Sequence, residues 1–502
     1  LDYDEMYDAG EDIWADVDQS GTYTLGNEGD HWGTIAGEIS EDDETDSYSW
    51  GVDVPNSGQY YLMAEIESPT QLRTDHSEIP LHIKPYTKWT TYLGGSQIER
   101  FSCVATDSAG NVYVAGETAS PGWVSGGYDA AHNGGNDIYV AKFSASGEHL
   151  WSTYLGGGGD DGARGLTVDP ADNVLVTGLT TSAGWVAGGY DTTLAGSDDG
   201  FVVSLSSDGQ HQWSTYLGGD GADQGMDLVA DEAGNVYVAG YTGSVGWAAG
   251  GFDTTHNGML DGFAAKLDAS GQHVWSTYLG GGDQDHGYGI GLDDSGAVMI
   301  AGRTRSVGWA AGGFDTTLGG TQDAFLAKLT SAGGHDWSTY LGGASSETGN
   351  GVAVFPTGES VVTGLTTSAG WVSGGYDISL GGTQDGFAAR IDSSGVHRWS
   401  TYLGGSGWDP ATRPTVGPGG DVFVTGSTSS TSSDGWVHDG FDVTPNGMAD
   451  PFVGRLDFEG QPKWFSYLGG ADTDNGRQVT LSGDGRMYVV GKTDSPGWVQ
   501  GP

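Results

Sequence analysis

Short runs of alternating apolar and polar residues recur along the chain, and glycine, aspartate or asparagine separates them. One representative stretch contains such runs at residues 166–169, 173–178, 201–205 and 212–217, with a long glycine-rich loop between the second and the third. Alternation with a period of two predicts β-strands, and no helical periodicity is present. The pattern therefore predicts an all-β chain made of four-stranded antiparallel units.

The four-stranded unit is repeated. The heptapeptide Trp-Ser-Thr-Tyr-Leu-Gly-Gly begins at Trp151, Trp213, Trp275, Trp337 and Trp399, and looser copies begin at Trp89 and Trp464. Successive copies lie 62 residues apart (213 − 151), except for a last interval of 65 residues (464 − 399). Repeats of this length are single supersecondary units that stack on one another. Four antiparallel strands per unit, repeated radially, predict the blades of a β-propeller.

The two ends of the repeat array are incomplete. Seven fourth strands are present, but only a first and a second strand follow the last of them, at residues 478–481 and 487–491. The missing third and fourth strands are predicted at residues 79–83 and 86–93. Pairing of the N- and C-terminal strands in one sheet would close a seven-bladed β-propeller and remove open strand edges. The alternative is an open solenoid or a truncated chain.

Residues 1–77 lack the repeat and are predicted to form a small N-terminal antiparallel β unit, followed by the propeller at residues 78–502. Residues 1–20 are acidic and loop-like, and strands are predicted near residues 21–25, 31–39, 47–54 and 59–66. Four strands alone leave open edges and a bare apolar face. We therefore expect the propeller, an upstream segment or a neighbouring subunit to cover this unit.

Several recurring strings resemble a known family. WSTYLGG is followed by NVYVAG at residues 111–116 and 235–240, then by GGYD or GGFD, then by DGF before an apolar run. Together they resemble the SBBP-type β-propeller repeat of secreted and surface bacterial proteins, a family with no assigned activity. Residues 33–35, 46–50 and 58–61 resemble part of a bacterial pre-peptidase C-terminal β-sandwich domain. The resemblance implies a propeller outside the cell and leaves its function open.

Charge and cysteine content narrow the choice of partners. The 502 residues include 67 acidic and 18 basic residues, which gives a formal net charge of −49. Nucleic acids and anionic lipid surfaces require basic patches, so neither is expected as a partner. Cys103 is the single cysteine, which excludes an intramolecular disulfide framework. No run of 18 apolar residues occurs, so no membrane insertion is expected.

Two sets of tryptophans recur. The tryptophan of WSTYLGG lies in a strand and is predicted to fill the space between neighbouring blades. The second set lies in the long loops, where each ring either pins its loop or stacks on a sugar. This set is the candidate ligand-binding group: Trp123, Trp185, Trp247, Trp309, Trp371 and Trp436, with Trp498 in the last, incomplete repeat.

Two aspartates recur in each long loop, eight residues apart (199 − 191). The first set is Asp129, Asp191, Asp253, Asp315, Asp377 and Asp442, and the second is Asp137, Asp199, Asp261, Asp323, Asp385 and Asp450. Short carboxylates commonly accept backbone N–H bonds and hold turns. The alternative is calcium, which takes several carboxylate and carbonyl oxygens. No EF-hand or nonapeptide calcium signature is present, so turn-holding is favoured.

Residues that break the repeat are the places where an enzyme site would be sought. They are Cys103, His286, Tyr288, Arg303, Arg305, Trp408, Arg413 and the longer loop at residues 429–434. They are predicted to be scattered over several blades without forming a nucleophile, a base and an orienting group. His132 and His256 lack metal-ligand spacing. We therefore expect no catalysis and no cofactor, with calcium as the single alternative.

The sequence thus predicts a non-catalytic, extracellular or cell-surface structural protein. Its expected partner is itself, because the N-terminal unit looks incomplete alone and would link copies head to tail into a fibre or surface array. The alternative is a surface adhesin or binding module that recognises a glycan, a peptide or another surface protein on an acidic, tryptophan-bearing face. That face is expected to carry the long loops and the connections between blades.

Overall fold

The computed structural model describes residues 6–8, 11–17, 23–27, 60–67 and 86–496. The described residues form two compact units, each of which we consider by itself. The smaller contains strands β1–β3, and the larger contains β4 and everything from residue 87 onward. Among the described residues, no helix has the length and apolar character required to cross a membrane.

Six sheets of the larger unit are built from consecutive strands. The first two contain β6 (Glu99–Thr106), β7 (Val112–Thr118), β8 (Asp137–Phe143) and β9 (His149–Leu155), then β10 (Asp161–Val168), β11 (Val174–Thr180), β12 (Asp199–Leu205) and β13 (His211–Leu217). The next two contain β14 (Asp223–Ala230), β15 (Val236–Thr242), β16 (Asp261–Leu267) and β17 (His273–Leu279), then β18 (Asp285–Leu292), β19 (Val298–Thr304), β20 (Asp323–Leu329) and β21 (His335–Leu341).

The fifth and sixth of these sheets are less regular. The fifth contains β22 (Glu347–Val354), β23 (Ser360–Thr366), β24 (Gln384–Ile391), β25 (His397–Leu403) and the short β26 (Trp408–Asp409), which pairs with β24 in parallel. The sixth contains β27 (Thr415–Val416), β28 (Val422–Thr428), β29 (Asp450–Leu456) and β30 (Pro462–Tyr467). The first strand of the sixth repeat is broken because Pro410 and Pro414 cannot donate to a ladder.

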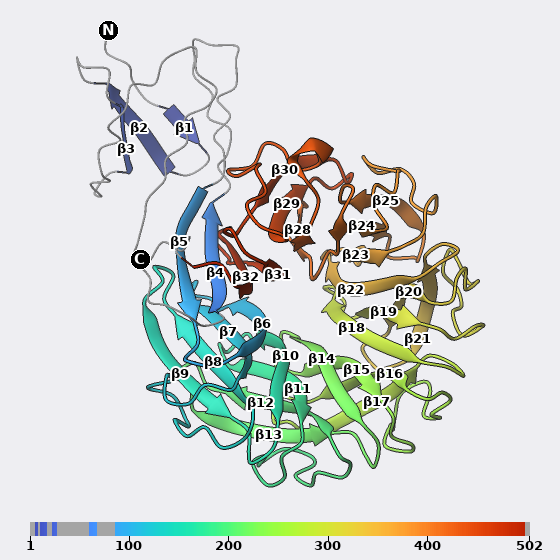
Figure 1. The fold of residues 1–502 in the computed structure, drawn as a ribbon. Helices are drawn as coiled ribbons and strands as arrows, with labels where there is room; N and C mark the ends of the chain where they lie inside the picture. The colour runs from blue at the N-terminus through green and yellow to red at the C-terminus, as the bar shows by residue number, and fades with distance from the viewer. Residues whose placement is uncertain (1–5, 9–10, 18–22, 28–59, 68–85, 497–502) are drawn as a thin grey trace. The chain divides into compact units, whose positions relative to one another are not determined.

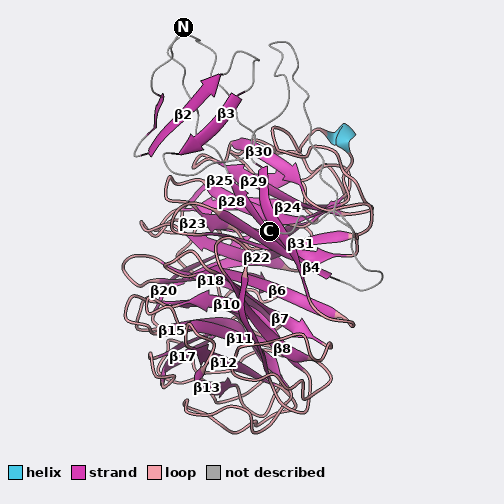
Figure 2. Ribbon diagram, turned by 90° about the vertical axis from the view of Figure 1, so that its left-hand side faces the viewer, coloured by secondary structure: helices cyan, strands magenta, loops and turns pink. Residues whose placement is uncertain are grey.

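The sheets of the larger unit are arranged around a common axis, with the first strand of each sheet innermost and the fourth outermost (Figure 1). Figure 2 shows the same sheets and their connecting loops from the side. The one short helix of the described residues, η1 (Ser432–Asp434), lies in the loop between β28 and β29. The larger unit is therefore an all-β propeller, as the alternation and the 62-residue period predict.

A further sheet combines strands from both ends of the chain. It has the order β31 (Asp474–Leu481), β32 (Met487–Thr493), β4 (Tyr60–Glu67) and β5 (Tyr86–Leu93). β32 pairs with β4 antiparallel, with Val489 opposite Ala64. On its other side β31 packs against β28 and β29, and it also packs against β6 of the first sheet.

The third strand of this sheet differs from the prediction. Residues 79–83, which were expected to supply it, lie outside the described residues, and the strand that pairs with β32 is β4. The predicted strand at residues 59–66 therefore forms, but it belongs to the propeller and not to the N-terminal unit. Assigning all of residues 1–77 to that unit was wrong in this respect, because the apolar strand Tyr60–Glu67 matches the length of the other third strands.

The smaller unit contains a three-stranded antiparallel sheet of β1 (Met6–Asp8), β2 (Glu11–Val17) and β3 (Tyr23–Asn27). The prediction of a loop over residues 1–20 was wrong. In β2, Ile13, Ala15 and Val17 alternate with Asp12 and Asp16, and this period of two is a strand pattern despite the acidic composition. The strand predicted near residues 21–25 is confirmed as β3, and those at 31–39 and 47–54 lie outside the described residues.

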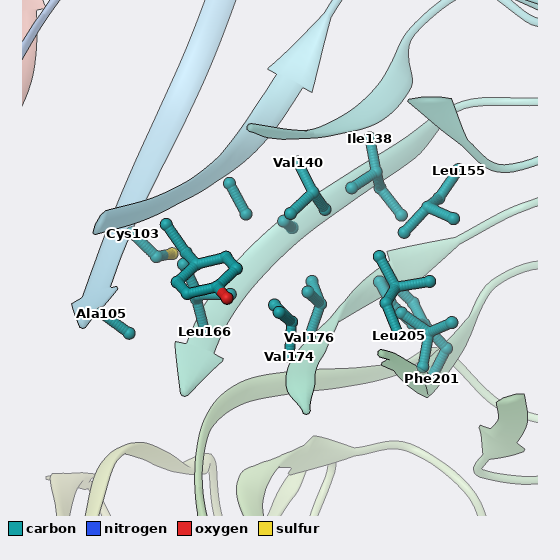
Figure 3. Close-up of a cluster of buried hydrophobic side chains, with 14 of the residues drawn as sticks. Cys103, Ala105, Ile138, Val140, Leu155, Leu166, Val174, Val176, Phe201 and Leu205 are labelled. Carbon is teal, nitrogen blue, oxygen red and sulfur yellow. The ribbon is translucent and has the colours of Figure 1, made fainter. Parts of the chain in front are cut away.

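The core lies between neighbouring sheets. Figure 3 shows Ile138, Val140 and Leu155 of one sheet facing apolar side chains of the next, among them Val176 and Phe201. All five side chains are at most 3% exposed. Burial of this kind is repeated in the other clusters, so the apolar face of each sheet is buried against its neighbours and not against a central core.

The tryptophan of WSTYLGG attaches each sheet to the next. Trp213 is buried, and its Nε1 donates to the carbonyl oxygen of Ala269, 3.1 Å away in the turn between β16 and β17. In the same turn Gly271 has φ +76, and a Cβ there would lie 2.4 Å from the Trp213 ring. The prediction that these tryptophans fill the space between blades is confirmed.

The long loop makes a second attachment between sheets. Gly188 bridges to Ser214 of its own fourth strand, and the next aromatic residue, Tyr190, donates its N–H to the carbonyl oxygen of Gly271 at 3.0 Å. The Tyr190 ring also lies 5.1 Å from the imidazole ring of His273 in that sheet. The same ring pairs recur as Tyr128 with His211, Phe252 with His335, and Phe314 with His397.

Candidate functional site

The loop tryptophans are used by their own sheets. The indole Nε1 of Trp185 donates to Thr180 Oγ1 at 3.0 Å, and the ring meets Phe201 edge-on at 5.4 Å between centroids. Trp123, Trp247, Trp309 and Trp371 make the corresponding hydrogen bonds with the last threonine of the second strand. Trp436 is buried and packs on Phe452, and Trp498 lies outside the described residues. Their geometry is that of loop anchors.

The first repeated aspartate organises the loop. Asp191 Oδ1 accepts the N–H of Thr193 at 2.9 Å, which forms a tight local turn. The backbone N–H of Asp191 donates to Thr215 Oγ1 at 2.8 Å, so the turn is fastened to the outer strand. The corresponding side-chain bonds are present at Asp129, Asp253, Asp315, Asp377 and Asp442.

The second repeated aspartate is buried where the third strand begins. Asp199 is 1% exposed, and its carboxylate accepts the N–H groups of Ala195 at 3.0 Å and Gly196 at 3.3 Å. Burial raises the pKa of Asp199 to about 6, and the nearby charges of Asp223 and Asp191 act in the same direction. Burial likewise raises the pKa values of Asp323 and Asp385 to about 6. Asp137, Asp261 and Asp450 have the same turn-holding bonds and pKa values raised by burial.

A third repeated acid begins the first strand of each repeat. Asp223, which is fully buried, accepts the N–H of Gly219 at 2.8 Å and the hydroxyl of Ser244 at 2.6 Å. It also accepts a short hydrogen bond from Thr242, and burial raises its pKa. The other members of this set are Glu99, Asp161, Asp285, Glu347, Asp409 and Asp474. These carboxylates connect the end of the second strand to the inter-blade connection.

The aspartate pairs were the candidate calcium ligands. Each buried carboxylate of a long loop faces one carboxylate from the next repeat, and both already accept hydrogen bonds from the surrounding turns. Over the described part of the chain, no group of three or more His, Cys, Asp or Glu residues is arranged to hold a metal ion. The favoured turn-holding interpretation describes the observed geometry, and calcium binding stays a prediction.

The histidines also have structural partners. His132 Nε2 lies 3.1 Å from the carbonyl oxygen of Thr118, and His256 Nε2 lies 3.3 Å from that of Thr242. His211 Nε2 lies 2.9 Å from Ser214 Oγ, and burial lowers the pKa of His211. The imidazoles therefore hold loops and outer strands at their places in the repeat.

The residues that break the repeat are brought together at the hub. Cys103, Tyr288, Trp408 and Arg413 come from three different repeats, yet all four line one cavity of 430 Å³. They come from several blades, as predicted, but the convergence of these four on one cavity was not predicted. In a propeller the innermost strands converge on one axis, so equivalent positions far apart in sequence face the same space.

The lining of this hub cavity depends on one feature of the innermost strands. The ladder between β10 and β11 shifts at Ala163/Gly165, which leaves Arg164 as the extra residue of a β-bulge. The same shift makes Met226, Tyr288 and Asn350 the extra residues of bulges in the following sheets, and Arg477 the extra residue in β31. All five bulged residues line the hub cavity.

An ion pair lies beside the hub cavity. Arg413 Nη1 lies 3.3 Å from Asp227 Oδ1, and Arg413 also donates a short hydrogen bond to the carbonyl oxygen of Met226. Burial raises the pKa of Asp227, and Arg413 acts in the opposite direction. Arg413 and Gln478 also line a second hub cavity of 180 Å³, so they lie between the two spaces.

Tyr288 connects the cavity wall to a buried polar cluster. Its hydroxyl lies 3.1 Å from His286 Nδ1, and the guanidinium of Arg303 lies 5.7 Å from the centre of its ring. Burial, together with the charges of Arg303 and Arg305, lowers the pKa of His286 to about 3, so the imidazole is neutral at pH 7. Arg305 donates hydrogen bonds to the side-chain amide oxygens of Gln322 and Gln284.

Sequence reasoning missed Arg164, Met226, Asp227, Asn350 and Arg477. Each is unremarkable as a residue type, and none disturbs the strand pattern. The available signal was positional, because residues 164, 226, 288 and 350 are 62 apart and carry Arg, Met, Tyr and Asn, whereas their neighbours are mostly repeated. The longer loop at residues 429–434 is also part of the irregular set, but it does not line the hub cavity.

Four segments of the chain match the SBBP family, which is described as a beta-propeller repeat: residues 88–122, 150–184, 212–245 and 463–497. Three further copies of WSTYLGG, beginning at Trp275, Trp337 and Trp399, lie outside the matched segments.

Two curated relatives are distant. An uncharacterized WD repeat-containing protein of Acanthamoeba polyphaga mimivirus is 24% identical over 274 residues, which cover 46% of this chain and 19% of that protein. Regulatory protein FlaEY of Caulobacter vibrioides is 24% identical over 300 residues, which cover 55% of this chain and 30% of that protein. The matched part is therefore less than a third of either relative.

Solved structures with a related shape include Sqt1 from Chaetomium thermophilum, with a TM-score of 0.36 and 12% identity over 78% of this chain and 95% of that one. An apocarotenoid oxygenase of Synechocystis has a TM-score of 0.38 and 10% identity, over 78% of this chain and 86% of that one. Likenesses this low carry no argument about activity.

Proposed function

This chain carries SBBP-type β-propeller repeats. We propose that it is a non-catalytic, extracellular structural protein. In this proposal the propeller is a rigid seven-bladed platform, and the N-terminal unit links one copy to the next. The repeated tryptophans, threonines and aspartates support the first part, because their polar groups are engaged in holding sheets and loops together.

Closure of the ring is part of the proposal. Six sheets arise from consecutive strands, and the sheet of β31, β32, β4 and β5 would be the seventh blade. Its support is the contact of β31 with both β28 and β6, together with a tryptophan attachment of the usual kind, since Trp89 Nε1 donates to Ala145 at 3.3 Å. Class averages of single particles seen along the axis would count the blades directly, and six blades or an open arc would contradict closure.

The observation that carries the assembly proposal is the small N-terminal sheet. Within the described residues β1 and β3 are its outer strands, and each pairs on one side with β2. Outer strands present unpaired N–H and C=O groups that another chain can use. We therefore propose that this sheet adds a strand from, or gives a strand to, a second copy of the chain.

The test is removal of residues 1–51, which takes away β1–β3 and leaves β4 in place. Light scattering after size-exclusion chromatography should show concentration-dependent assembly of the full chain and a monomer for the truncated one. Circular dichroism and thermal unfolding of the truncated chain check that its propeller remains folded. Assembly that persists unchanged in the folded, truncated chain would exclude the N-terminal sheet as the link.

The second candidate is an adhesin or binding module, with a glycan, a peptide or another surface protein as its partner. The specific observation in its favour is a set of exposed aromatic rings at 62-residue spacing: Tyr128, Tyr190, Phe252 and Phe314, between 43% and 60% exposed. Glycan-array binding with and without calcium tests it, and a Tyr190→Ala variant should reduce any signal. The anchored loop tryptophans would contribute little under this proposal.

A further inference from the structure

The hub cavity has an unusual balance of charge for this chain. The whole sequence has 67 acidic and 18 basic residues, so composition alone predicts that the charged side chains around a cavity are mostly carboxylates. The residues that line the 430 Å³ cavity instead include Arg164, Arg413 and Arg477, and no aspartate or glutamate. The excess of arginine is local to the hub, because the exposed connections around it carry Asp160, Asp220, Asp283 and Asp472.

The arginines come from different sheets and converge through the β-bulge. Arg164 and Arg477 are bulged residues of β10 and β31, and Arg413 follows Thr412, which occupies the equivalent place in the sixth repeat. A bulge re-aims the side chain of its extra residue, and here it directs the extra residue of each innermost strand to the axis. Three guanidinium groups on separate sheets can surround one ligand without competing for the same backbone.

Two of the three arginines are oriented by ion pairs. Arg164 Nη1 lies 3.2 Å from Glu117 Oε2, and Arg413 Nη1 lies 3.3 Å from Asp227 Oδ1. Arg164 Nη1 also donates to the carbonyl oxygen of Ala163 at 3.1 Å, and Arg413 donates to that of Met226. The existing ion pairs therefore fix the orientation of these groups, which is what pre-organises an anion site.

The rest of the lining is suited to an apolar body. Met226 and Leu365 contribute aliphatic surface, and the rings of Tyr288 and Trp408 contribute aromatic surface, with Trp408 43% exposed. Leu365 and Trp408 lie at the end of the hub where the second strands end and the long loops begin. A cavity of this volume falls in the range of small-molecule sites, which combine apolar walls with a few placed polar groups.

We propose that the hub cavity binds one small organic anion, in which a carboxylate or phosphate group faces the arginines and an apolar or aromatic part packs against Tyr288, Trp408 and Met226. This inference goes beyond the proposed structural role and does not depend on assembly. The ligand would enter from the end of the hub that carries the long loops. The Arg413–Asp227 pair closes the inner end of the site.

Isothermal titration calorimetry of the full chain tests the proposal with four probes: phenyl phosphate, benzoate, inorganic phosphate and benzylamine. We expect one site per chain for phenyl phosphate, benzoate or both, weaker binding of inorganic phosphate, which lacks the ring, and no binding of the cationic benzylamine. Comparison of the affinities for phenyl phosphate and benzoate shows whether the site prefers a phosphate or a carboxylate group. Affinity should fall as salt is raised, because charged contacts are screened.

Variants locate the site. Arg477→Gln removes an exposed guanidinium and should weaken binding of the anionic probe about tenfold, the loss expected for one charge-assisted hydrogen bond. Arg398→Gln is the matched control, because Arg398 is 53% exposed on an outer strand and pairs with Asp392 away from the hub. It should bind as the unmodified chain does. Thermal unfolding confirms that both variants are folded.

Three results would overturn the proposal. The first is no saturable binding of either aromatic anion by the folded chain. The second is binding that Arg477→Gln and a Trp408→Ala variant both leave unchanged, which would place the ligand elsewhere. The third is benzylamine binding as tightly as benzoate, which would show that the cavity selects the ring and not the charge.

Discussion

Arg413 and Asp227 form an ion pair across the hub, with 3.3 Å between Arg413 Nη1 and Asp227 Oδ1. Along the chain, two complete sheets lie between the sheet of Asp227 and the sheet of Arg413. The two residues occupy the same position of two repeats, where the neighbouring repeats have Gly165, Gly289 and Gly351. A Cβ at Gly351 would lie 2.8 Å from the Arg413 Cα, so the innermost strands are too close there for most side chains. The pair therefore occupies two positions whose equivalents in the neighbouring repeats are glycine.

Removal of one partner of this pair should destabilise the propeller. Both side chains are 15% exposed, so Asp227→Gly leaves a largely buried guanidinium without its carboxylate. Loss of one partner of a buried pair costs about 3–5 kcal/mol, and the access of water to the hub should reduce this to about 2 kcal/mol. Urea unfolding measures the loss. The double variant Asp227→Gly with Arg413→Gly restores the glycine of the other repeats and should lose less than the sum of the single variants.

The turn that receives each WSTYLGG tryptophan should not tolerate a side chain. In Gly271→Ala the new Cβ would lie 2.4 Å from the Trp213 ring, at a residue with φ +76. We expect a loss of stability well above the approximately 1 kcal/mol that a positive φ alone costs an alanine. Gly308→Ala is the control, because Gly308 has the same φ and nothing within 4 Å of its Cβ position. Equal losses in thermal unfolding would exclude steric contact with Trp213 as the cause.

The buried loop carboxylates predict a pH effect that a neutral substitution can isolate. Burial raises the pKa of Asp199 to about 6, so its contribution to stability is fully present below its ordinary pKa and is lost as pH rises through 6. The stability of Asp199→Asn relative to the unmodified chain should therefore increase between pH 5 and pH 7. Chemical unfolding at several pH values measures this difference, and a difference independent of pH would contradict the assigned shift.

Asp268→Asn is the matched control for that experiment. Partial burial acts to raise the pKa of Asp268, but hydrogen bonds from Gln272 and Ser270 outweigh it and lower the pKa. A lowered pKa contributes stability that is lost only as pH falls below the ordinary value of 3.8, so the relative stability of this variant should stay constant between pH 5 and pH 7. A slope at Asp199 together with a constant difference at Asp268 would separate the effect of burial from that of removing any aspartate.

Removal of β4 tests whether the chain ends depend on each other. A chain that begins at residue 68 lacks the strand that pairs with β32, whereas one that begins at residue 52 retains it. We expect the shorter chain to unfold at a lower temperature and to expose backbone amides of β32 to hydrogen exchange. Protection of β32 at the same level in both chains would show that β4 is not its partner in solution.

Much of the fold could be predicted from the sequence because each blade is determined by local patterns. Period-two alternation defined the strands, and the spacing of Trp151 and Trp213 defined the repeat. The exception is β4, which was assigned to the wrong unit. In complete repeats a short turn such as residues 206–210 joins the third and fourth strands, whereas residues 68–85 separate β4 from β5. Proximity in sequence was therefore a poor guide to the partner of β5.

The hub could be predicted only in part. Arg413, Trp408, Tyr288 and Cys103 were recognised as irregular, because they interrupt a nearly uniform repeat. Their convergence was missed, since it arises from the radial arrangement of whole sheets and not from any spacing within one repeat. Asp227 could not be identified as the partner of Arg413 without knowing which sheets face each other across the axis.

The contact between Trp213 and the turn at Ala269 bears on how the chain is made. The tryptophan is synthesised 56 residues before the carbonyl group that receives it. During translation each newly completed blade thus presents one indole that has no receptor until the next blade is made. A partly synthesised repeat array therefore exposes one such indole, on its most recently completed blade. Because only the next blade supplies the carbonyl group that binds it, blades are expected to pack in chain order and not with distant repeats.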